Sequence, residues 1–152
     1  IIFLSLPNLV IRFFQHTSDE EVHEVTDRTY WENRGSKTTV SMVDELVTIV
    51  KQLDPALELK YNKFYIGLAR QGQPDNFVIF RPQKNSLRVE PRLKKSEDIE
   101  QKIESAGLDV IEYDNRGGRY RIRLGKGEVK KHTDILSGLF SLAHTEFDGG
   151  NS

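Results

Sequence analysis

Arg119-Tyr120-Arg121-Ile122-Arg123-Leu124 carries an arginine at every second position, with two large apolar side chains and a tyrosine at the others. Successive side chains of a β-strand point to opposite faces of a sheet. The alternation therefore predicts a strand with the three arginines on one face, while Tyr120, Ile122 and Leu124 fill the core on the other.

The segments before this hexapeptide also show strand patterns. Side chains alternate with a period of two over residues 63–69 and 87–93, and the continuous apolar run at 77–80 is typical of an interior strand. Residues 108–113 and 119–124 flank the loop Asp114-Asn115-Arg116-Gly117-Gly118, which predicts a hairpin. Short turns between the strands favour antiparallel pairing.

Helix signals surround the strands. Asp27 precedes a short helix at 28–33, and Ser36 or Thr38 caps a longer helix that ends at Asp54-Pro55. Ser96 opens a third helix with an acidic first turn, and a last helix spans about 128–143. We therefore expect an α+β fold in two layers, with a mainly antiparallel sheet of about five to six strands and three main helices.

Length and composition exclude several classes of protein. The 152 residues are 37% hydrophobic and 30% charged, which suits one folded domain rather than a disordered chain. The absence of cysteine excludes disulfide scaffolds, thiolate metal sites and cysteine nucleophiles. The apolar opening run 1–14 is interrupted by Pro7, Asn8 and Arg12 and lacks signal-peptide features, so we expect a cytoplasmic protein without a membrane segment.

Three regions are expected along the chain. Residues 1–25 are interpreted as the remnant of a preceding region, or as N-terminal strands plus a linker. Residues 26–146 form the α+β domain, and residues 147–152 form a small, polar, disordered tail. The chain begins at Ile1, and its one methionine is Met42, so it is interpreted as a fragment or a processed product.

No set of residues predicts an active site. Glu58 and Lys60, with Asp54 upstream, have the spacing by which restriction-endonuclease-like enzymes hold a divalent metal, but the upstream carboxylate lies at the end of a helix. The four histidines are scattered and lack metal-ligand spacing. We therefore expect no catalytic residues, no metal site and no cofactor.

Charge is distributed in blocks although the net charge is −1. Basic side chains dominate residues 59–95 and 116–131, and acidic ones dominate the remaining segments. An arginine-rich sheet face with tyrosines beside it, Tyr65 and also Tyr61, suits a phosphate backbone with bases that stack on the rings. The candidate nucleic-acid-binding residues, for DNA or RNA, are Lys60, Lys63, Tyr65, Arg88, Arg92, Arg119, Arg121 and Arg123.

Internal pairing is the competing interpretation of the same arginines. Glu90, Glu112 and the acidic helix at 97–104 could neutralise them across the sheet. Surface ion pairs of this kind are common and contribute about 0–1 kcal/mol each. The positions of the acidic side chains in the fold distinguish a cationic face that is available to a ligand from one that is neutralised.

Several motifs together resemble a known family. The segments are Thr26–Glu32, Leu59–Leu68, Asn76–Pro82, Leu108–Val110 with Tyr113-Asp114, and Gly118–Leu124. Over residues 26–146 the chain resembles an uncharacterised bacterial domain family sometimes labelled "predicted transport protein", whose members often follow a restriction-endonuclease-like region. The resemblance implies a compact accessory domain and carries over no catalytic residue, and any nuclease region would lie upstream of Ile1.

The function expected from these observations is that of a non-enzymatic accessory domain of a DNA-processing or defence protein, which binds nucleic acid through its arginine-rich sheet face. One alternative is a protein-interaction or dimerisation module that uses the N-terminal segment and the helix with Tyr30 and Trp31. Another is a small anionic-ligand site at Tyr61, Asn62, Lys63 and Tyr65.

Overall fold

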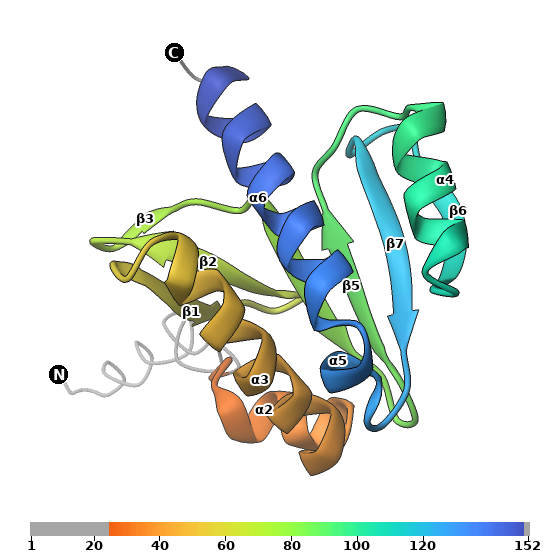
Figure 1. The fold of residues 1–152 in the computed structure, drawn as a ribbon. Helices are drawn as coiled ribbons and strands as arrows, with labels where there is room; N and C mark the ends of the chain where they lie inside the picture. Colours follow the sequence, from red (N-terminus) through yellow and green to blue (C-terminus); the bar gives the residue numbers. More distant parts are fainter. Residues whose placement is uncertain (1–24, 151–152) are drawn as a thin grey trace, which may run out of the picture.

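An antiparallel sheet forms the centre of the molecule (Figure 1). The computed structural model describes residues 25–150, with side chains to Phe147. The strand order is β1-β2-β4-β5-β7-β6, and the short β3 pairs with β2. The strands are β1 (Leu57–Tyr61), β2 (Ile66–Arg70), β3 (Gln73–Pro74), β4 (Val78–Pro82), β5 (Leu87–Pro91), β6 (Asp109–Asp114) and β7 (Arg119–Leu124).

Helices cover one face of this sheet. They are α2 (Arg28–Arg34), α3 (Lys37–Leu53), α4 (Glu97–Ser105), α5 (Glu128–Lys131) and α6 (Thr133–Gly150). α3 and α6 cross the middle of the sheet, and α4 lies over β6 and β7 on the same side (Figure 1). The α+β class and the antiparallel sheet are therefore confirmed, and residues 25–150 contain two short helices in addition to the three main ones.

The predicted helix starts are present as hydrogen-bonded caps. The Asp27 carboxylate accepts from the backbone of Tyr30, and the Ser96 hydroxyl accepts from the backbone of Ile99. Ser36, not Thr38, caps α3, in a capping box with Thr39. Each cap satisfies backbone N–H groups that the first turn of a helix leaves without partners.

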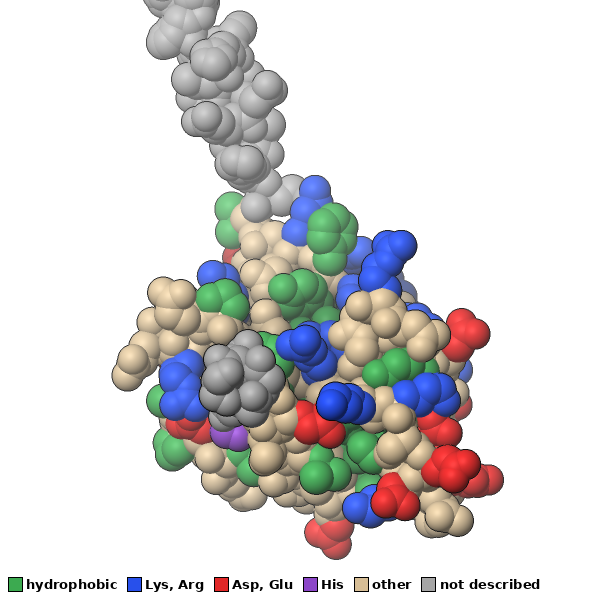
Figure 2. Space-filling view, turned by 90° about the horizontal axis from the view of Figure 1, so that it is seen from above, with side chains coloured by type: hydrophobic (Ala, Val, Ile, Leu, Met, Phe, Trp, Pro, Cys, Tyr) green, Lys and Arg blue, Asp and Glu red, His purple; other side chains and the backbone are tan. Residues whose placement is uncertain are grey.

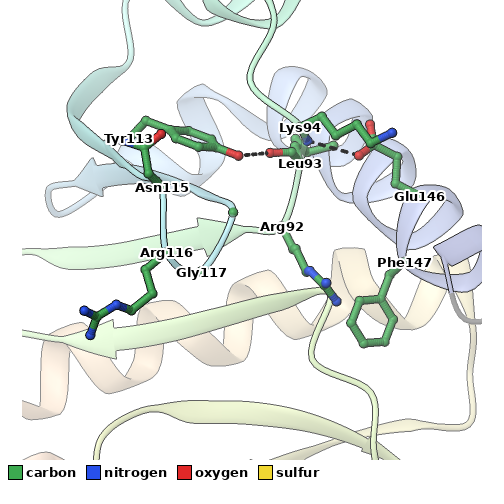
Figure 3. Close-up of a pocket in the computed structure, with 10 residues that line it drawn as sticks. Arg92, Leu93, Lys94, Tyr113, Asn115, Arg116, Gly117, Glu146 and Phe147 are labelled. Atoms are coloured by element: carbon green, nitrogen blue, oxygen red, sulfur yellow. Dashed lines mark hydrogen bonds between the residues drawn. The ribbon is translucent and has the colours of Figure 1, made fainter.

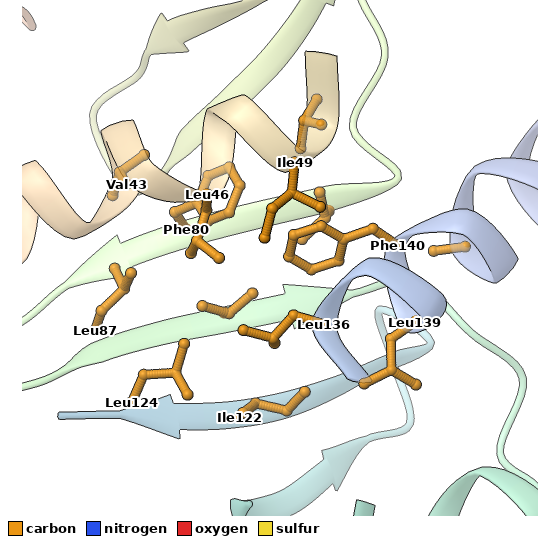
Figure 4. Close-up of a cluster of buried hydrophobic side chains, with 14 of the residues drawn as sticks. Val43, Leu46, Ile49, Phe80, Leu87, Ile122, Leu124, Leu136, Leu139 and Phe140 are labelled. Carbon is orange, nitrogen blue, oxygen red and sulfur yellow. The ribbon is translucent and has the colours of Figure 1, made fainter. Parts of the chain in front are cut away.

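The core lies between the helices and the sheet (Figure 4). Leu46 of α3, Phe80 of β4, Phe140 of α6 and Ile122 of β7 are each fully buried. The rings of Phe80 and Phe140 meet edge to face with their centroids 6.5 Å apart. Burying each such side chain contributes about 1.5–3 kcal/mol. The apolar half of the β7 alternation therefore packs in the core, as the hexapeptide predicts.

Some boundaries differ from the expected ones. The last helix is divided at His132 into α5 and α6, and α6 continues to Gly150 rather than ending near Ala143. Phe64 lies in the β1–β2 turn with 60% of its surface exposed, not in a strand. The N-terminal strands expected before residue 25 lie outside the described residues. No helix in the described part of the chain has the length and apolar character needed to cross a membrane.

Candidate nucleic-acid interface

The strand pairing gathers arginines on the sheet face opposite the described helices α2 to α6. Arg81 lies opposite Arg88, Arg88 lies opposite Arg123, and Arg92 pairs with Arg119. Directly paired residues of antiparallel strands share a face. We call this surface the arginine face; it consists of Arg81, Arg88, Arg92, Arg119, Arg121 and Arg123.

Glu90 lies buried beneath two of these arginines. Its side chain is 2% exposed, and its Oε2 accepts hydrogen bonds from Arg81 Nε at 3.0 Å and Arg88 Nε at 2.8 Å. Arg81 and Arg88 keep 30% and 28% of their side chains exposed. One carboxylate thus holds two guanidinium groups in place. Because two cations share one anion, the surface above Glu90 keeps a net positive charge.

Arg119 is a structural brace in the arginine face. Its guanidinium donates to the backbone oxygen of Glu90 at 2.9 Å and to that of Asn76 at 2.8 Å. Burial lowers the pKa of Arg119, the nearby Glu90 carboxylate opposes this shift, and the charge of Arg92 adds to it. The side chain therefore joins β7 to the neighbouring segments and contributes its charge from below the surface.

Arg121 and Arg123 are more available. Arg121 Nε donates to the backbone oxygen of Glu112 at 2.7 Å, so it is paired with a carbonyl rather than a carboxylate. Arg123 Nη1 lies 3.2 Å from Asp109 Oδ2, and both of these side chains are at least half exposed. Solvent weakens such exposed pairs, so a phosphate can compete with them.

Internal neutralisation is partial. Among the described residues, the acidic side chains that interact with these arginines are Glu90, Asp109 and Asp114, which are fewer than the arginines themselves. The acidic helix α4 lies on the opposite side of the sheet, where Glu100 pairs with Lys95 at 2.6 Å and accepts from the Tyr120 hydroxyl. The proposed neutralisation by α4 is therefore wrong, because the arginines and α4 occupy opposite faces.

The remaining candidate residues differ in how far they join this surface. Tyr65 does join it, because the Arg81 guanidinium lies 5.9 Å from the Tyr65 ring centre. Lys60 is exposed on β1 opposite Gly67, whose position next to the Tyr65 ring places it on the same side of the sheet. Lys63 lies in the β1–β2 turn, and its backbone oxygen accepts from Tyr30 and Arg34.

The expected small-ligand cluster does not converge. Tyr61 lies opposite the buried Ile66, so it belongs to the helix-covered side of the sheet, whereas Tyr65 lies on the other side. Asn62 instead accepts from the Trp31 ring nitrogen through its backbone oxygen at 2.8 Å. Trp31 is itself 1% exposed, so it belongs to the core and cannot form the contact surface of an interaction module.

Sequence reasoning missed Arg81 as a member of this surface. Its signal was present, because Arg81 directly follows the core residue Phe80 in a strand and so points to the opposite face. A hollow of about 380 Å³ between the β4–β5 turn and β6 was not foreseen either. Arg88, Arg123 and Ile111 line it, so the arginine face is indented at this end.

The residues that suggested a metal site have structural roles or lie exposed at the surface. Asp54 forms an ion pair with Arg70, which also lies 3.6 Å from Asp75, and Glu58 and Lys60 are exposed on β1. Within residues 25–147, no three histidine or acidic side chains gather in a way that could hold a metal ion.

The surface charges are unevenly distributed. Figure 2 looks onto the end of the sheet where β5 finishes; most Lys and Arg side chains lie over its centre and upper right, and Asp and Glu side chains are most frequent at its lower right, with some of each sign in both regions. The lower right of this view corresponds to the front of Figure 1, where α4 lies.

Comparison with known proteins gives no match to a family model, a curated protein or a solved structure. The resemblance of residues 26–146 to a bacterial accessory-domain family therefore stays a prediction. Support for a function comes from the geometry of the arginine face.

Proposed function

We propose that this domain binds nucleic acid through the arginine face, as a non-enzymatic accessory domain of a DNA-processing or defence protein. The observation that carries the proposal is a sheet face on which arginines outnumber the carboxylates placed against them, with the acidic α4 on the other side. A phosphate backbone is the polyanion that such an extended row of guanidinium groups fits.

The arginines of this face have different roles in the proposed binding. Glu90 holds Arg81 and Arg88 in fixed orientations, so these two side chains lose little conformational freedom when they meet a phosphate. Arg121 and Arg123 supply charges that are held weakly enough to turn toward the ligand. Arg119 positions the strand, and its guanidinium is already committed to two backbone oxygens.

Tyr65 gives the surface a place for a base. Its ring lies beside Arg81 at the edge of the arginine face, with the exposed Lys60 on the next strand. Stacking of a base on an aromatic ring tolerates any sequence. The combination favours binding to phosphate and to unpaired bases rather than the reading of a defined duplex sequence.

Fluorescence anisotropy with labelled single- and double-stranded oligonucleotides, both DNA and RNA, tests the proposal at one low salt concentration. The variant Arg121→Ala/Arg123→Ala should bind about 10-fold or more weakly, because it loses two charge-assisted contacts. Lys51→Ala/Lys102→Ala is the matched control, since it removes the same charge from exposed positions on the helices. Absence of binding by the unmodified protein, or equal losses in both variants, would refute the proposal.

A further inference from the structure

A cleft of about 330 Å³ opens where β5 ends (Figure 3). It lies between the turn at 115–118 of the β6–β7 hairpin and the last described side chains of α6, Glu146 and Phe147. Arg92 and Lys94 enter it from the segment that follows β5. Three parts of the chain that are distant in sequence therefore form its walls.

Hydrogen bonds hold these walls in place. The Tyr113 hydroxyl donates to the backbone oxygen of Leu93 at 2.6 Å, and Glu146 Oε1 accepts from the backbone nitrogen of Lys94 at 3.1 Å. Asp114 Oδ1 accepts from the backbone nitrogens of Arg116 and Gly117, which closes the hairpin turn. These hydrogen bonds fix the three walls of the cleft relative to one another.

Positive charge dominates the cleft. Arg92, Lys94 and Arg116 are exposed, and none of their side chains forms an ion pair within 4 Å among the residues that the structure describes. Glu146 is the carboxylate among the lining side chains, and one of its oxygens is occupied by the backbone of Lys94. The surplus of charge suits a group with more than one negative charge, such as a phosphate.

One wall of the cleft is aromatic. The Arg92 guanidinium lies over the Phe147 ring, 5.0 Å from its centre, so a planar cation and an aromatic ring are stacked in this wall. Nucleobases stack on aromatic rings and on guanidinium planes alike. The volume also exceeds that of a lone phosphate and falls in the range of about 300–1,000 Å³ that small-molecule sites occupy.

We propose that this cleft binds a nucleoside monophosphate, with its base stacked against the Arg92–Phe147 pair. The charged end of Arg116 points away from Arg92 in Figure 3, so the exposed side chains of Arg116 and Lys94 turn toward the phosphate when the nucleotide binds. The inference goes beyond the proposed function, because it depends on a different set of side chains and shares Arg92 alone with the arginine face. The same chemistry is offered by a free nucleotide and by the phosphorylated end of a nucleic-acid strand.

NMR titration of the ¹⁵N-labelled protein with adenosine 5′-monophosphate, and separately with inorganic phosphate, tests the site. We expect the amide signals of Gly117, Gly118 and Lys94 to move with the nucleotide and to respond more weakly to phosphate. Arg116→Ala should weaken nucleotide binding about 10-fold, because it removes one charge-assisted contact. Lys102→Ala, which removes a charge from the exposed side of α4, should leave the affinity unchanged.

Glu146→Gln gives a result that loss of structure would not imitate. The amide oxygen of the new side chain can still accept from the backbone of Lys94, while the negative charge disappears, so nucleotide affinity should rise a few-fold. The inference is overturned if the three amides stay still at millimolar nucleotide, if Arg116→Ala binds as well as the unmodified protein, or if Glu146→Gln binds more weakly.

Oligonucleotides with and without a 5′-phosphate distinguish the two sources. A preference for the phosphorylated strand that Arg116→Ala abolishes identifies a strand end as the ligand, and binding of the mononucleotide without such a preference identifies a free nucleotide. Loss of oligonucleotide binding in Arg121→Ala/Arg123→Ala with no nucleotide in the cleft would refute this inference alone. The opposite pattern would refute the arginine face alone.

Discussion

The two faces of the sheet are built by opposite means although they alternate along the same strands. On the helix-covered face, Phe80, Leu87 and Ile122 are fully buried among apolar neighbours. On the arginine face, the most buried side chain is a carboxylate, Glu90, which is held by Arg81 and Arg88. One face is organised by the exclusion of water and the other by ion pairs around a single anion.

The comparison explains where stability and binding should reside. Apolar burial is not directional and grows with area, so the helix-covered face should dominate the free energy of folding. Ion pairs at partly exposed arginines contribute less, but they keep charged groups available at the surface. Substitutions on the two faces should therefore separate folding from nucleic-acid binding.

The largest effect on stability is expected at Phe80. Phe80→Ala should lower the free energy of unfolding by about 3–5 kcal/mol, because it leaves a cavity beside Phe140 in the core. Phe64→Ala is the matched control, since that ring is 60% exposed and its removal should change stability by no more than about 0.5 kcal/mol. Urea unfolding followed by circular dichroism measures both; equal losses would contradict the assignment of the core.

Glu90 should come next. Glu90→Ala leaves Arg81 and Arg88 without their shared partner, and we expect a loss of about 2–4 kcal/mol, near the lower part of the range for buried pairs because the arginines are partly exposed. Asp109→Ala breaks the exposed pair with Arg123 and should cost about 0.5 kcal/mol or less. If the two variants unfolded at the same urea concentration, Glu90 would not organise the arginine face.

The smallest expected effect is the change in stability when Asp114, at the end of the arginine face, is protonated. The backbone amides of Gly117 and Arg116 hold the pKa of Asp114 below its ordinary value of 3.8, and the charges of Arg121 and Arg119 act in the same direction. A lowered pKa in the folded state means that ionised Asp114 stabilises the fold above about pH 4, and that this contribution is lost as the pH falls through the folded pKa.

NMR titration of the Asp114 carboxyl carbon measures that pKa directly. We expect a midpoint below 3.8, with the Gly117 amide signal moving in the same pH range. A midpoint at or above this value would show that the turn does not hold the carboxylate as described.

Local patterns predicted much of this architecture. The alternation in Arg119–Leu124 placed Tyr120, Ile122 and Leu124 in the core, and three capping residues marked helix starts that the structure contains. Alternation and capping depend on residues that are close together in the chain, so they can be predicted from a single sequence. The strand registers that put Arg88 between Arg81 and Arg123 join distant segments, and no local pattern specifies them.

The candidate site shows the same limit. Sequence identified Arg88, Arg121 and Arg123 as residues of one face, but it could not show that Arg119 is committed to backbone oxygens. It also assigned Tyr61 to the face of Tyr65, because the turn between β1 and β2 hid the change of side. Partners that come from other strands decide which arginines are available to bind.

The salt dependence of oligonucleotide binding tests the central claim most directly. Each phosphate contact contributes a slope of about −0.9 for duplex DNA, or about −0.7 for a single strand, to a plot of log K against log salt concentration. We expect binding by the unmodified protein to weaken steeply with salt, and Arg121→Ala/Arg123→Ala to reduce the slope by about 1–2 in magnitude. If the affinity of this variant fell with salt as steeply as that of the unmodified protein, the arginine face would not contact phosphate.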